Sequence, residues 1–321
     1  MKIVVTGGAG FIGSCIVRTL NDMGIEDIVI VDNIGSTEKW KNIVNKKYTE
    51  YINKMHFLQK LSDIGKIDAI IHMGACSATT ELDFDYLYNN NFEYTKTLWN
   101  YCVENQIVFI YASSAATYGD GSNGFEDCDD ISKLQPLNGY GYSKQIFDLW
   151  VKRQHIFPKQ YVGLKFFNVY GPNEYFKGNM ASVIFHSFNR IQNGEKIKLF
   201  KSYKEGYNDG EQLRDFIYVK DICKVIKFFL ENPSKSGLFN LGTGKAQTFK
   251  ELAIAVYKAL DMPIEIEYIE MPVSLRPKYQ YFTEARMDQL RRIGYNGHFC
   301  DLNEGAEDYV KNYLNKQYQI F

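Results

Sequence analysis

The tyrosine and lysine of Tyr140-Gly141-Tyr142-Ser143-Lys144 are the residues of this chain best placed to do chemistry. At this spacing both side chains lie on one face of a helix. A phenol, with a pKa of about 10, is a poor base at neutral pH unless a nearby cation stabilises its phenolate. A fixed Lys144 ammonium beside a cationic nicotinamide would do so. The pair indicates proton transfer coupled to hydride transfer, although the same spacing also occurs on ordinary exposed helices.

Two adjacent serines, Ser113 and Ser114, follow an apolar run that reads as a buried strand. A hydroxyl at this strand end can donate a hydrogen bond to a substrate oxygen beside Tyr140. Serines also form turns after strands, so the pair alone decides nothing. Ser114, Tyr140 and Lys144 together indicate a hydride-transfer site.

Glycines at positions 7, 10 and 13 follow the first apolar strand and predict a dinucleotide site. Gly7 permits a sharp turn, Gly10 lets the backbone approach a pyrophosphate, and Gly13 lets helix and strand pack closely. The N-terminus of the following helix then faces the anion. A second apolar run ends at Asp32, where an acidic side chain can bind a ribose hydroxyl.

Strands and helices alternate through the first half of the chain. Strand-like apolar runs recur at residues 69–73, 108–111 and 161–167, with helical patterns at 90–105 and 141–155. This order predicts an α/β fold, a doubly wound parallel Rossmann sheet whose ligand crevice lies at the carboxyl ends of the strands.

The alternation breaks after Asn168, which predicts a smaller, discontinuous α/β substrate domain. We expect residues 1–168 and 216–242 to form the nucleotide-binding domain. Residues 169–215 and 243–321 are expected to form the substrate-binding domain.

Local patterns place the later elements. Residues 201–213 are polar and contain glycine, which predicts an exposed loop. Asp221 is expected to cap a helix, and Thr248 with Glu251 has the spacing of a capping box. The tail from Thr283 onward is expected to be helical in two pieces.

Composition narrows the class of protein. The 321 residues are 45% hydrophobic, enough for one large domain or two modest ones. A net charge of -1 provides no basic surface for nucleic acid or an anionic membrane. No stretch is long and apolar enough to span a bilayer, and the first strand leaves no room for a signal peptide. We therefore predict a cytoplasmic protein that binds neither nucleic acid nor membrane.

Cysteines and histidines are scattered, so we predict reduced thiols and no metal site. The residues concerned are Cys15, Cys76, Cys102, Cys128, Cys223 and Cys300, with His56, His72, His155, His186 and His298.

Several longer stretches, spread over essentially the whole chain, resemble a known family. They comprise residues 74–81, 111–119, 136–138, 140–144, 167–172, 177–178, 180–182 and 214–216. These stretches resemble the ADP-L-glycero-D-manno-heptose 6-epimerases, which are extended short-chain dehydrogenase/reductases of the NAD-dependent epimerase/dehydratase superfamily.

The resemblance implies epimerisation at C6 of an ADP-heptose, a step toward the lipopolysaccharide core. NADP held by the enzyme, with NAD the less favoured choice, would take a hydride from C6 and return it to the other face of a 6-keto intermediate. The family's two acid/base residues map to Tyr140 and Lys177, since one base cannot reach hydroxyls on opposite sides of a carbon. Lys144 would stabilise the phenolate and bind ribose, and Ser114 would polarise the sugar oxygen. Homo-oligomers, pentamers among them, are expected for the family.

The glycine motif and the resemblance together predict two sets of binding residues. Those expected at the cofactor are Gly7, Gly10, Phe11, Ile12, Gly13, Asp32, Asn33, Lys39, Lys54, Met73, Gly74, Ala75, Cys76, Ser77, Asn90, Tyr140 and Lys144. Those expected at the nucleotide-sugar substrate are Asn168, Val169, Lys177, Asn179, His186, Phe200, Arg214 and Tyr279. Asp32 favours NAD because its charge repels a 2′-phosphate, but Lys39 and Lys54 can offset that charge. The planar fork of Arg214 suits a diphosphate.

Individual residues distinguish this chain from proteins of the same fold that have other activities. Ala115 and Ala116 stand where nucleotide-sugar 4,6-dehydratases carry an Asp-Glu pair, so elimination is not expected. A UDP-hexose 4-epimerase shares the Ser, Tyr and Lys residues, but it uses NAD and needs no base at Lys177. A non-catalytic NADP-sensing regulator would not require Tyr140 and Lys144.

The chain departs from the family pattern at three places. Met73 replaces an expected glutamate beside the cofactor, and Asn179 replaces an expected serine. The loop 201–213 is longer than the family's. These departures bear on the nucleotide base and the sugar stereochemistry.

Overall fold

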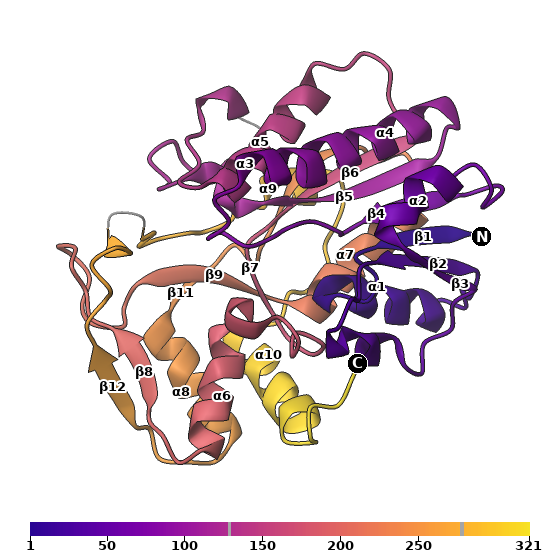
Figure 1. The fold of residues 1–321 in the computed structure, drawn as a ribbon. Helices are drawn as coiled ribbons and strands as arrows, with labels where there is room; N and C mark the ends of the chain where they lie inside the picture. Colours follow the sequence, from indigo (N-terminus) through magenta and orange to yellow (C-terminus); the bar gives the residue numbers. More distant parts are fainter. Residues whose placement is uncertain (128–129, 277–278) are drawn as a thin grey trace.

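A seven-stranded parallel sheet forms the centre of the computed structural model, which describes residues 1–127, 130–276 and 279–321 (Figure 1). The strand order is β10-β6-β5-β4-β1-β2-β3. The strands are β1 Ile3–Thr6, β2 Ile28–Asp32, β3 Glu50–Asn53, β4 Ala69–His72, β5 Val108–Ser114, β6 Gln160–Phe166 and β10 Gly237–Leu241. The predicted doubly wound α/β fold is confirmed.

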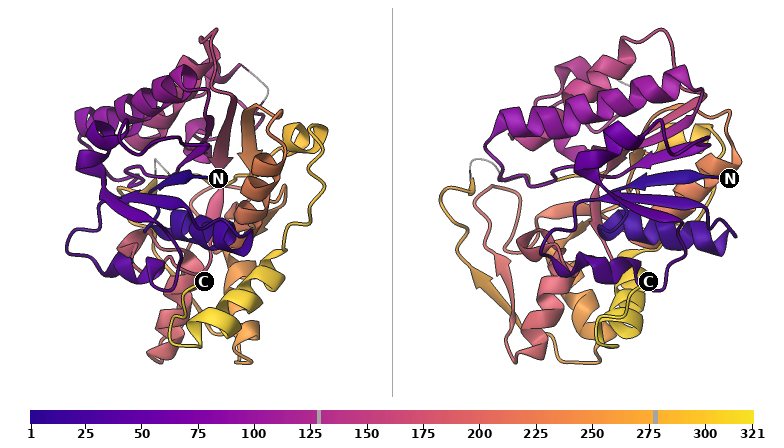
Figure 2. Two further views of the ribbon diagram at one scale, coloured as in Figure 1. Left: turned by 90° about the vertical axis from the view of Figure 1, so that its right-hand side faces the viewer. Right: turned by 45° about the vertical axis from the view of Figure 1, so that its right-hand side comes forward.

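Helices cover both faces of this sheet (Figures 1 and 2). One face carries α1 Phe11–Asp22 and α7 Val219–Glu231, and the other α2 Lys54–Lys60, α3 Phe84–Leu87, α4 Tyr94–Glu104 and α5 Gly139–Lys152. Successive strand residues point to opposite faces, so Ile3 and Val5 pack in the cluster of α1 and α7, while Val4 packs in that of α4 and α5. Both faces of the strands are therefore buried, as in other parallel sheets.

The later segments form a smaller lobe beside the strand ends (Figure 1). Its sheets are β11-β9-β7 and β12-β8, with strands β7 Asn168–Tyr170, β8 Ile197–Phe200, β9 Leu213–Tyr218, β11 Ala246–Thr248 and β12 Ile266–Ile269. Its helices are α6 Val183–Gln192, α8 Phe249–Ala259 and α10 Leu302–Tyr309. Ile217 and Leu252 share one buried cluster with Val5 of the large sheet.

Single-turn segments and a short helix join these elements. They are the 3-10 turns Glu38–Ile43, Ala115–Tyr118, Ile131–Lys133 and Gly178–Met180, the π turns Tyr88–Glu93 and Val310–Leu314, and α9 Asp288–Arg292. The helix predicted at 90–105 is thus a π turn followed by α4. The two helical pieces of the tail are α9 and α10.

The capping box is present as predicted, whereas the expected cap at Asp221 is wrong. Thr248 Oγ1 accepts the Glu251 N–H at 3.0 Å, and the Glu251 carboxylate accepts the Thr248 N–H at 2.7 Å. Asp221 lies inside the first turn of α7, buried, and accepts the Cys300 N–H at 2.7 Å. An acid in the first turn still stabilises a helix through its dipole.

Two further expectations are only partly met. β9 begins at Leu213 and lies in the small sheet, while α7 and β10 after it return to the large sheet. Residues 201–212 form the predicted loop, but Gln212 in it is buried and donates to the Phe200 carbonyl at 3.3 Å. The division into two domains stays a prediction.

Five cysteines of the described chain are free thiols, and Cys128 lies outside the described residues. The free thiols are Cys15, Cys76, Cys102, Cys223 and Cys300. Among the described residues, no helix combines the length and apolar character that crossing a membrane requires.

Replacement of Gly13 by alanine tests the contact between β1 and α1. A Cβ there would lie 2.1 Å from the carbonyl oxygen of Gly7, and backbone cannot move aside as a side chain can. We expect Gly13→Ala to lower the free energy of unfolding by about 2 kcal/mol, measured by urea denaturation. Asp22→Ala, at the exposed end of the same helix, is the control. Equal stability of Gly13→Ala and wild type would contradict this account.

His72 makes the stability of the fold depend on pH. It is buried at the end of β4, where its ring nitrogens lie 2.6 Å from Thr6 Oγ1 and 3.0 Å from Thr95 Oγ1. Burial, and secondarily the charge of Lys144, lower its pKa from 6.5 to about 3. Between these values only the unfolded chain binds the proton, so the stability contributed by neutral His72 is lost as the pH falls from 6.5 toward 3.

We therefore expect His72→Gln to lose less stability on acidification than wild type. The difference in slope should approach about 1.4 kcal/mol per pH unit within that window and vanish above it. Urea unfolding at a series of pH values measures both slopes. Identical slopes would mean that His72 titrates normally in the folded protein.

Candidate active site

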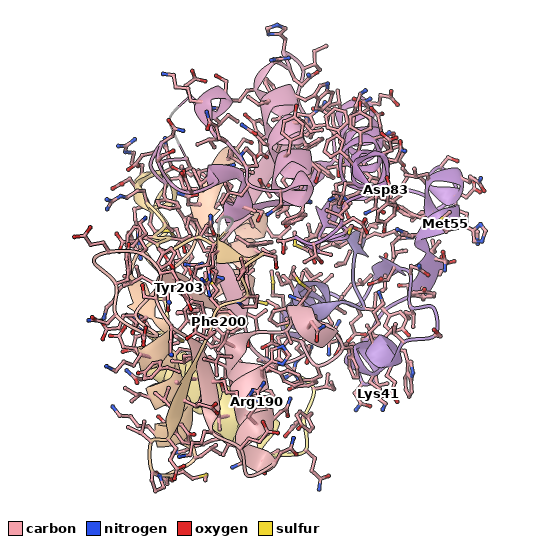
Figure 3. All side chains as sticks on the ribbon, turned by 60° about the vertical axis from the view of Figure 1, so that its left-hand side comes forward. Lys41, Met55, Asp83, Arg190, Phe200 and Tyr203 are labelled. Carbon is pink, nitrogen blue, oxygen red and sulfur yellow. The ribbon has the colours of Figure 1, made fainter. Side chains whose placement is uncertain are left out.

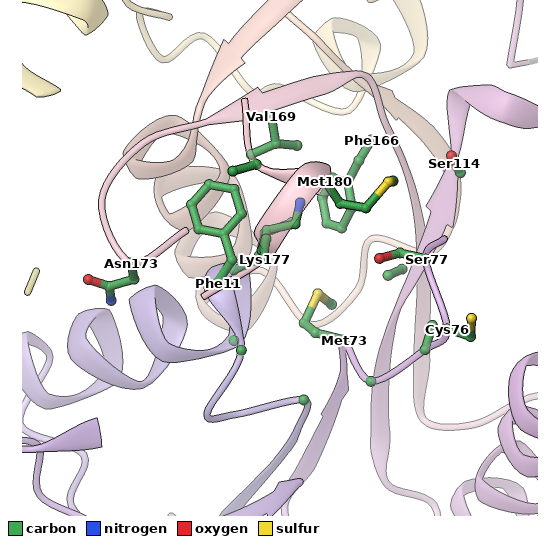
Figure 4. A pocket seen from close by; sticks show the side chains of 18 of the residues that line it. Phe11, Met73, Cys76, Ser77, Ser114, Phe166, Val169, Asn173, Lys177 and Met180 are labelled. Carbon is green, nitrogen blue, oxygen red and sulfur yellow. The ribbon is translucent and has the colours of Figure 1, made fainter. Parts of the chain in front are cut away.

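A cavity of about 700 Å³ lies at the carboxyl ends of β1, β2, β4 and β5, beside the smaller lobe (Figure 4). Its lining includes every residue predicted for the cofactor: Gly7, Gly10, Phe11, Ile12, Gly13, Asp32, Asn33, Lys39, Lys54, Met73, Gly74, Ala75, Cys76, Ser77, Asn90, Tyr140 and Lys144. It also includes Ser114, Lys177, Asn168 and Val169. The crevice lies where a doubly wound sheet binds ligands.

Five residues predicted for the substrate do not line this cavity: Asn179, His186, Phe200, Arg214 and Tyr279. Asn179 is exposed in the turn after Lys177, and His186 is half-buried on α6. The other three form a group on the side of the lobe where Figure 3 labels Phe200.

The Arg214 group lies next to the cavity. The guanidinium carbon is 5.3 Å from the centre of the Tyr279 ring, which is 6.2 Å from that of Phe200. The same carbon is 5.6 Å from the ring of Phe249, and Phe249 lines the cavity. Arg214 is buried and donates to the carbonyls of Leu213, at 2.8 Å, and Gln280.

The glycine turn fits the pyrophosphate of a dinucleotide. Gly7 has a φ of 65°, and a Cβ on it would lie 2.7 Å from the backbone nitrogen of Gly74. Gly10 is the N-cap of α1, and in this described segment no side chain caps the helix and no acid lies in its first turn. The first N–H groups of α1 are therefore available to an anion at the cavity wall.

An ion pair stands at the end of β2. The Asp32 carboxylate accepts the Ala9 N–H at 3.0 Å and lies 2.7 Å from Lys39 Nζ. Lys54 Nζ instead donates to Asn90 Oδ1, also at 2.7 Å. Of the two lysines predicted to offset Asp32, Lys39 is the one that pairs with it.

Tyr140 and Lys144 lie on successive turns at the start of α5. The Asn138 side chain accepts the Gly141 N–H at 2.8 Å and so fixes where the helix begins. Lys144 Nζ donates to the Ala112 carbonyl at 3.0 Å, which holds the ammonium against β5. Burial lowers the pKa of Lys144 to about 8. Burial raises the pKa of Tyr140, and a side-chain hydrogen bond with Ser114 lowers it.

The two serines at the end of β5 have different partners. Ser114 Oγ accepts the Ala116 N–H at 3.1 Å and is the serine hydroxyl bonded to Tyr140. Ser113 donates to Asp148 at 2.6 Å, inside the core. Both serines line the cavity, and the choice of Ser114 for the site stays a prediction.

Lys177 comes from the loop after β7. Its Nζ lies 5.2 Å from the centre of the Phe11 ring (Figure 4), and its N–H donates to the Glu174 carbonyl at 3.0 Å. The buried Glu174 carboxylate accepts the N–H and hydroxyl of Ser182, at 2.5 and 2.7 Å. Burial lowers the pKa of Lys177 and Glu174 raises it. A lysine with a lowered pKa in a cavity is suited to proton transfer.

Asn173 is a residue of the cavity wall that the sequence did not single out as a site residue. It has a φ of 74°, and its side-chain amide donates to Ser14 Oγ at 2.9 Å. Its carbonyl accepts from Asn42 Nδ2 at 3.0 Å. These bonds tie the Lys177 loop to α1 and to the 3-10 turn Glu38–Ile43. Only the turn signal of Gly171-Pro172-Asn173 could have indicated this position.

Known proteins resemble the chain over nearly its full length. The NAD dependent epimerase/dehydratase family matches residues 3–242. The ADP-L-glycero-D-manno-heptose-6-epimerase of Fusobacterium nucleatum is 53% identical, with 98% of each chain covered. The enzyme of the same name from Nitratidesulfovibrio vulgaris is also 53% identical, with 97% of each chain covered.

Solved structures share the fold. The ADP-L-glycero-D-manno-heptose-6-epimerase of Helicobacter pylori aligns with a TM-score of 0.80 and 27% identity, covering 97% of this chain and 95% of that one. The UDP-N-acetylglucosamine 4-epimerase of Methanobrevibacter ruminantium aligns with a TM-score of 0.83 and 28% identity, covering 98% of both. The chain belongs to the NAD dependent epimerase/dehydratase family and groups there with the relatives named ADP-L-glycero-D-manno-heptose-6-epimerase.

Proposed function

We propose that this enzyme converts ADP-D-glycero-D-manno-heptose to ADP-L-glycero-D-manno-heptose, in the synthesis of lipopolysaccharide core precursors. The observation that carries the proposal is that Tyr140 and Lys177 line one cavity together with the dinucleotide turn. Two proton-transferring groups from different elements can each serve the C6 hydroxyl of one epimer. The relatives at 53% identity that bear this activity in their names support the choice of sugar.

Each base serves one epimer. Tyr140, in α5, removes the proton from the C6 hydroxyl of one epimer as the carbonyl forms. Lys177, in the loop after β7, returns a proton to the oxygen once it projects to the other side. In the reverse direction the two residues exchange roles. Ser114 donates a hydrogen bond to the same oxygen, and Lys144 stabilises the Tyr140 phenolate.

The cofactor that we infer is NADP, with the α1 turn at its pyrophosphate and Asp32 and Lys39 at its ribose. Bound there, it would accept the hydride from C6 and return it. The ion pair of Lys39 with Asp32, at 2.7 Å, supports NADP because it offsets the charge that would repel a 2′-phosphate.

Arg214, we infer, binds the diphosphate of the nucleotide sugar. Its fork now donates to two backbone carbonyls, so binding would exchange carbonyl acceptors for phosphate oxygens. Phe200 and Tyr279, beside it, are proposed to contact the nucleotide. Asn179 and His186 would approach the sugar from the α6 side. An assembly of identical subunits is also proposed for this enzyme.

Removal of either base should abolish most activity without unfolding the protein. We expect Tyr140→Phe and Lys177→Met each to lower kcat by about 10²- to 10⁴-fold, because each removes a proton donor and acceptor. Tyr142→Phe and Lys258→Met, at exposed positions of α5 and α8, are matched controls. Unfolding midpoints establish that the variants are folded. Near wild-type kcat in both site variants would refute the two-base mechanism.

The substrate and the return of the hydride are tested together in heavy water. The protein, with NADP, is incubated with ADP-D-glycero-D-manno-heptose and the products are followed by NMR. We expect conversion to the L-glycero epimer with C6 free of solvent deuterium, because the hydride never exchanges. UDP-glucose, offered in parallel, should remain unconverted. Deuterium at C6, or conversion of UDP-glucose alone, would contradict the proposal.

A further inference from the structure

A buried ion pair lies behind the proposed catalytic groups. Lys165, on β6, and Asp148, on α5, are joined at 2.8 Å, with side chains 0% and 1% exposed. Burying two charges is costly unless further hydrogen bonds satisfy them. Asp148 also accepts from Ser113 at 2.6 Å and Tyr111 at 3.2 Å, and Lys165 donates to Thr117 at 2.7 Å. Each charge of the pair thus has a further hydrogen-bond partner within the core.

This network holds Ser114 from both sides. Ser113, bonded to Asp148, precedes it, and Thr117 Oγ1 donates to the Ser114 carbonyl at 2.8 Å. Ser113 is also the β5 residue paired in register with Lys165 of β6. The Ser114 hydroxyl therefore points into the cavity from a backbone that is fixed on each side.

The same network faces Lys144. Asp148 follows Lys144 by one turn of α5, on the same side of the helix. The other titratable groups near Lys144 are Cys76, after β4, the neutral His72 of β4, and Tyr140, one turn earlier on α5. Burial favours the neutral amine of Lys144, and the Asp148 charge favours the ammonium.

We propose that Asp148, held by Lys165, is a positioning residue of this site: through Ser113 it orients Ser114, and through its charge it keeps Lys144 an ammonium. The proposal rests on the proposed function, since only a phenolate base requires that ammonium. Nothing in it requires Asp148 to contact substrate or cofactor.

The protonation of Lys144 can be measured without any sugar. Protein labelled at lysine Cε is titrated by NMR in the presence of NADP, and Lys144→Met identifies the Lys144 signal. We expect Asp148→Asn to move the Lys144 titration to lower pH by about one unit, because an ammonium that loses a nearby anion releases its proton more readily. Asp85→Asn, an exposed carboxylate of α3, is the control.

A double variant separates charge from packing. Asp148→Asn with Lys165→Met removes both buried charges and keeps the volume, so it remains informative where Asp148→Asn alone fails to fold. We expect its Lys144 titration to lie between those of wild type and Asp148→Asn, because loss of the Lys165 ammonium partly offsets loss of the Asp148 carboxylate. The alkaline limb of kcat should move in the same direction, with KM little changed. A double variant that titrates as wild type would overturn the proposal.

Failure of this proposal differs from failure of the proposed function. A wild-type protein that does not convert ADP-heptose, yet shows the displaced Lys144 titration in both variants, refutes the substrate and supports the role of Asp148. Normal conversion together with an undisplaced titration refutes the role of Asp148 alone.

Discussion

The constraint on which this structure depends is that a charge taken out of water must be paired or hydrogen-bonded. The site gathers several such charges at the strand ends, and each has a defined partner. Asp32 pairs with Lys39, Glu174 accepts from Ser182, and Lys144 donates to a backbone carbonyl of β5. Because Lys39 and Lys144 bind across elements, to the end of β2 and to β5, these contacts also fix the relative positions of the elements. The cost of burying the charges is offset only while the sheet, α5 and the loop after β7 keep their places.

Different parts of the fold hold the two proposed bases in position. Tyr140 is placed by the capped start of α5, which packs on the large sheet. Lys177 belongs to a loop that would be mobile on its own, and Asn173 and Glu174 bind it to α1 and α6. A side chain on a loop is held less precisely than one on a helix unless neighbouring hydrogen bonds support the loop, and these bonds provide that support. The α1 and α6 contacts therefore bear on the chemistry although they touch no reacting atom.

Local signals in the sequence were sufficient for the large sheet and its turn. The glycines at 7, 10 and 13 follow from steric rules that act within a few residues, and so does the Thr248 capping box. Contacts between residues far apart in the sequence leave no such local pattern. No sequence motif includes Asp148 or Lys165, and the sequence pattern assigns residues 216–218 of β9 to the nucleotide-binding domain although β9 lies in the small sheet. Their partners are chosen by tertiary packing, which overrides periodicity. The resemblance to a family predicted the cofactor residues that line the cavity. It could not indicate that the ring of Phe249 lies between Arg214 and the cavity.

A short loop segment, rather than the sheet, must decide which reaction a protein of this fold catalyses. A doubly wound sheet with a glycine turn and a Ser, Tyr and Lys set supports many oxidations of a sugar carbon, and fold alone does not select among them. We infer that what restricts the outcome here is a second proton-transferring group, Lys177, which lines the same cavity as Tyr140. The loop from Gly171 to Ser182 supplies it, and the buried carboxylate of Glu174 lies three residues before Lys177. That carboxylate favours the ammonium while burial favours the amine, and a base that must both give and take a proton needs these two influences to be balanced.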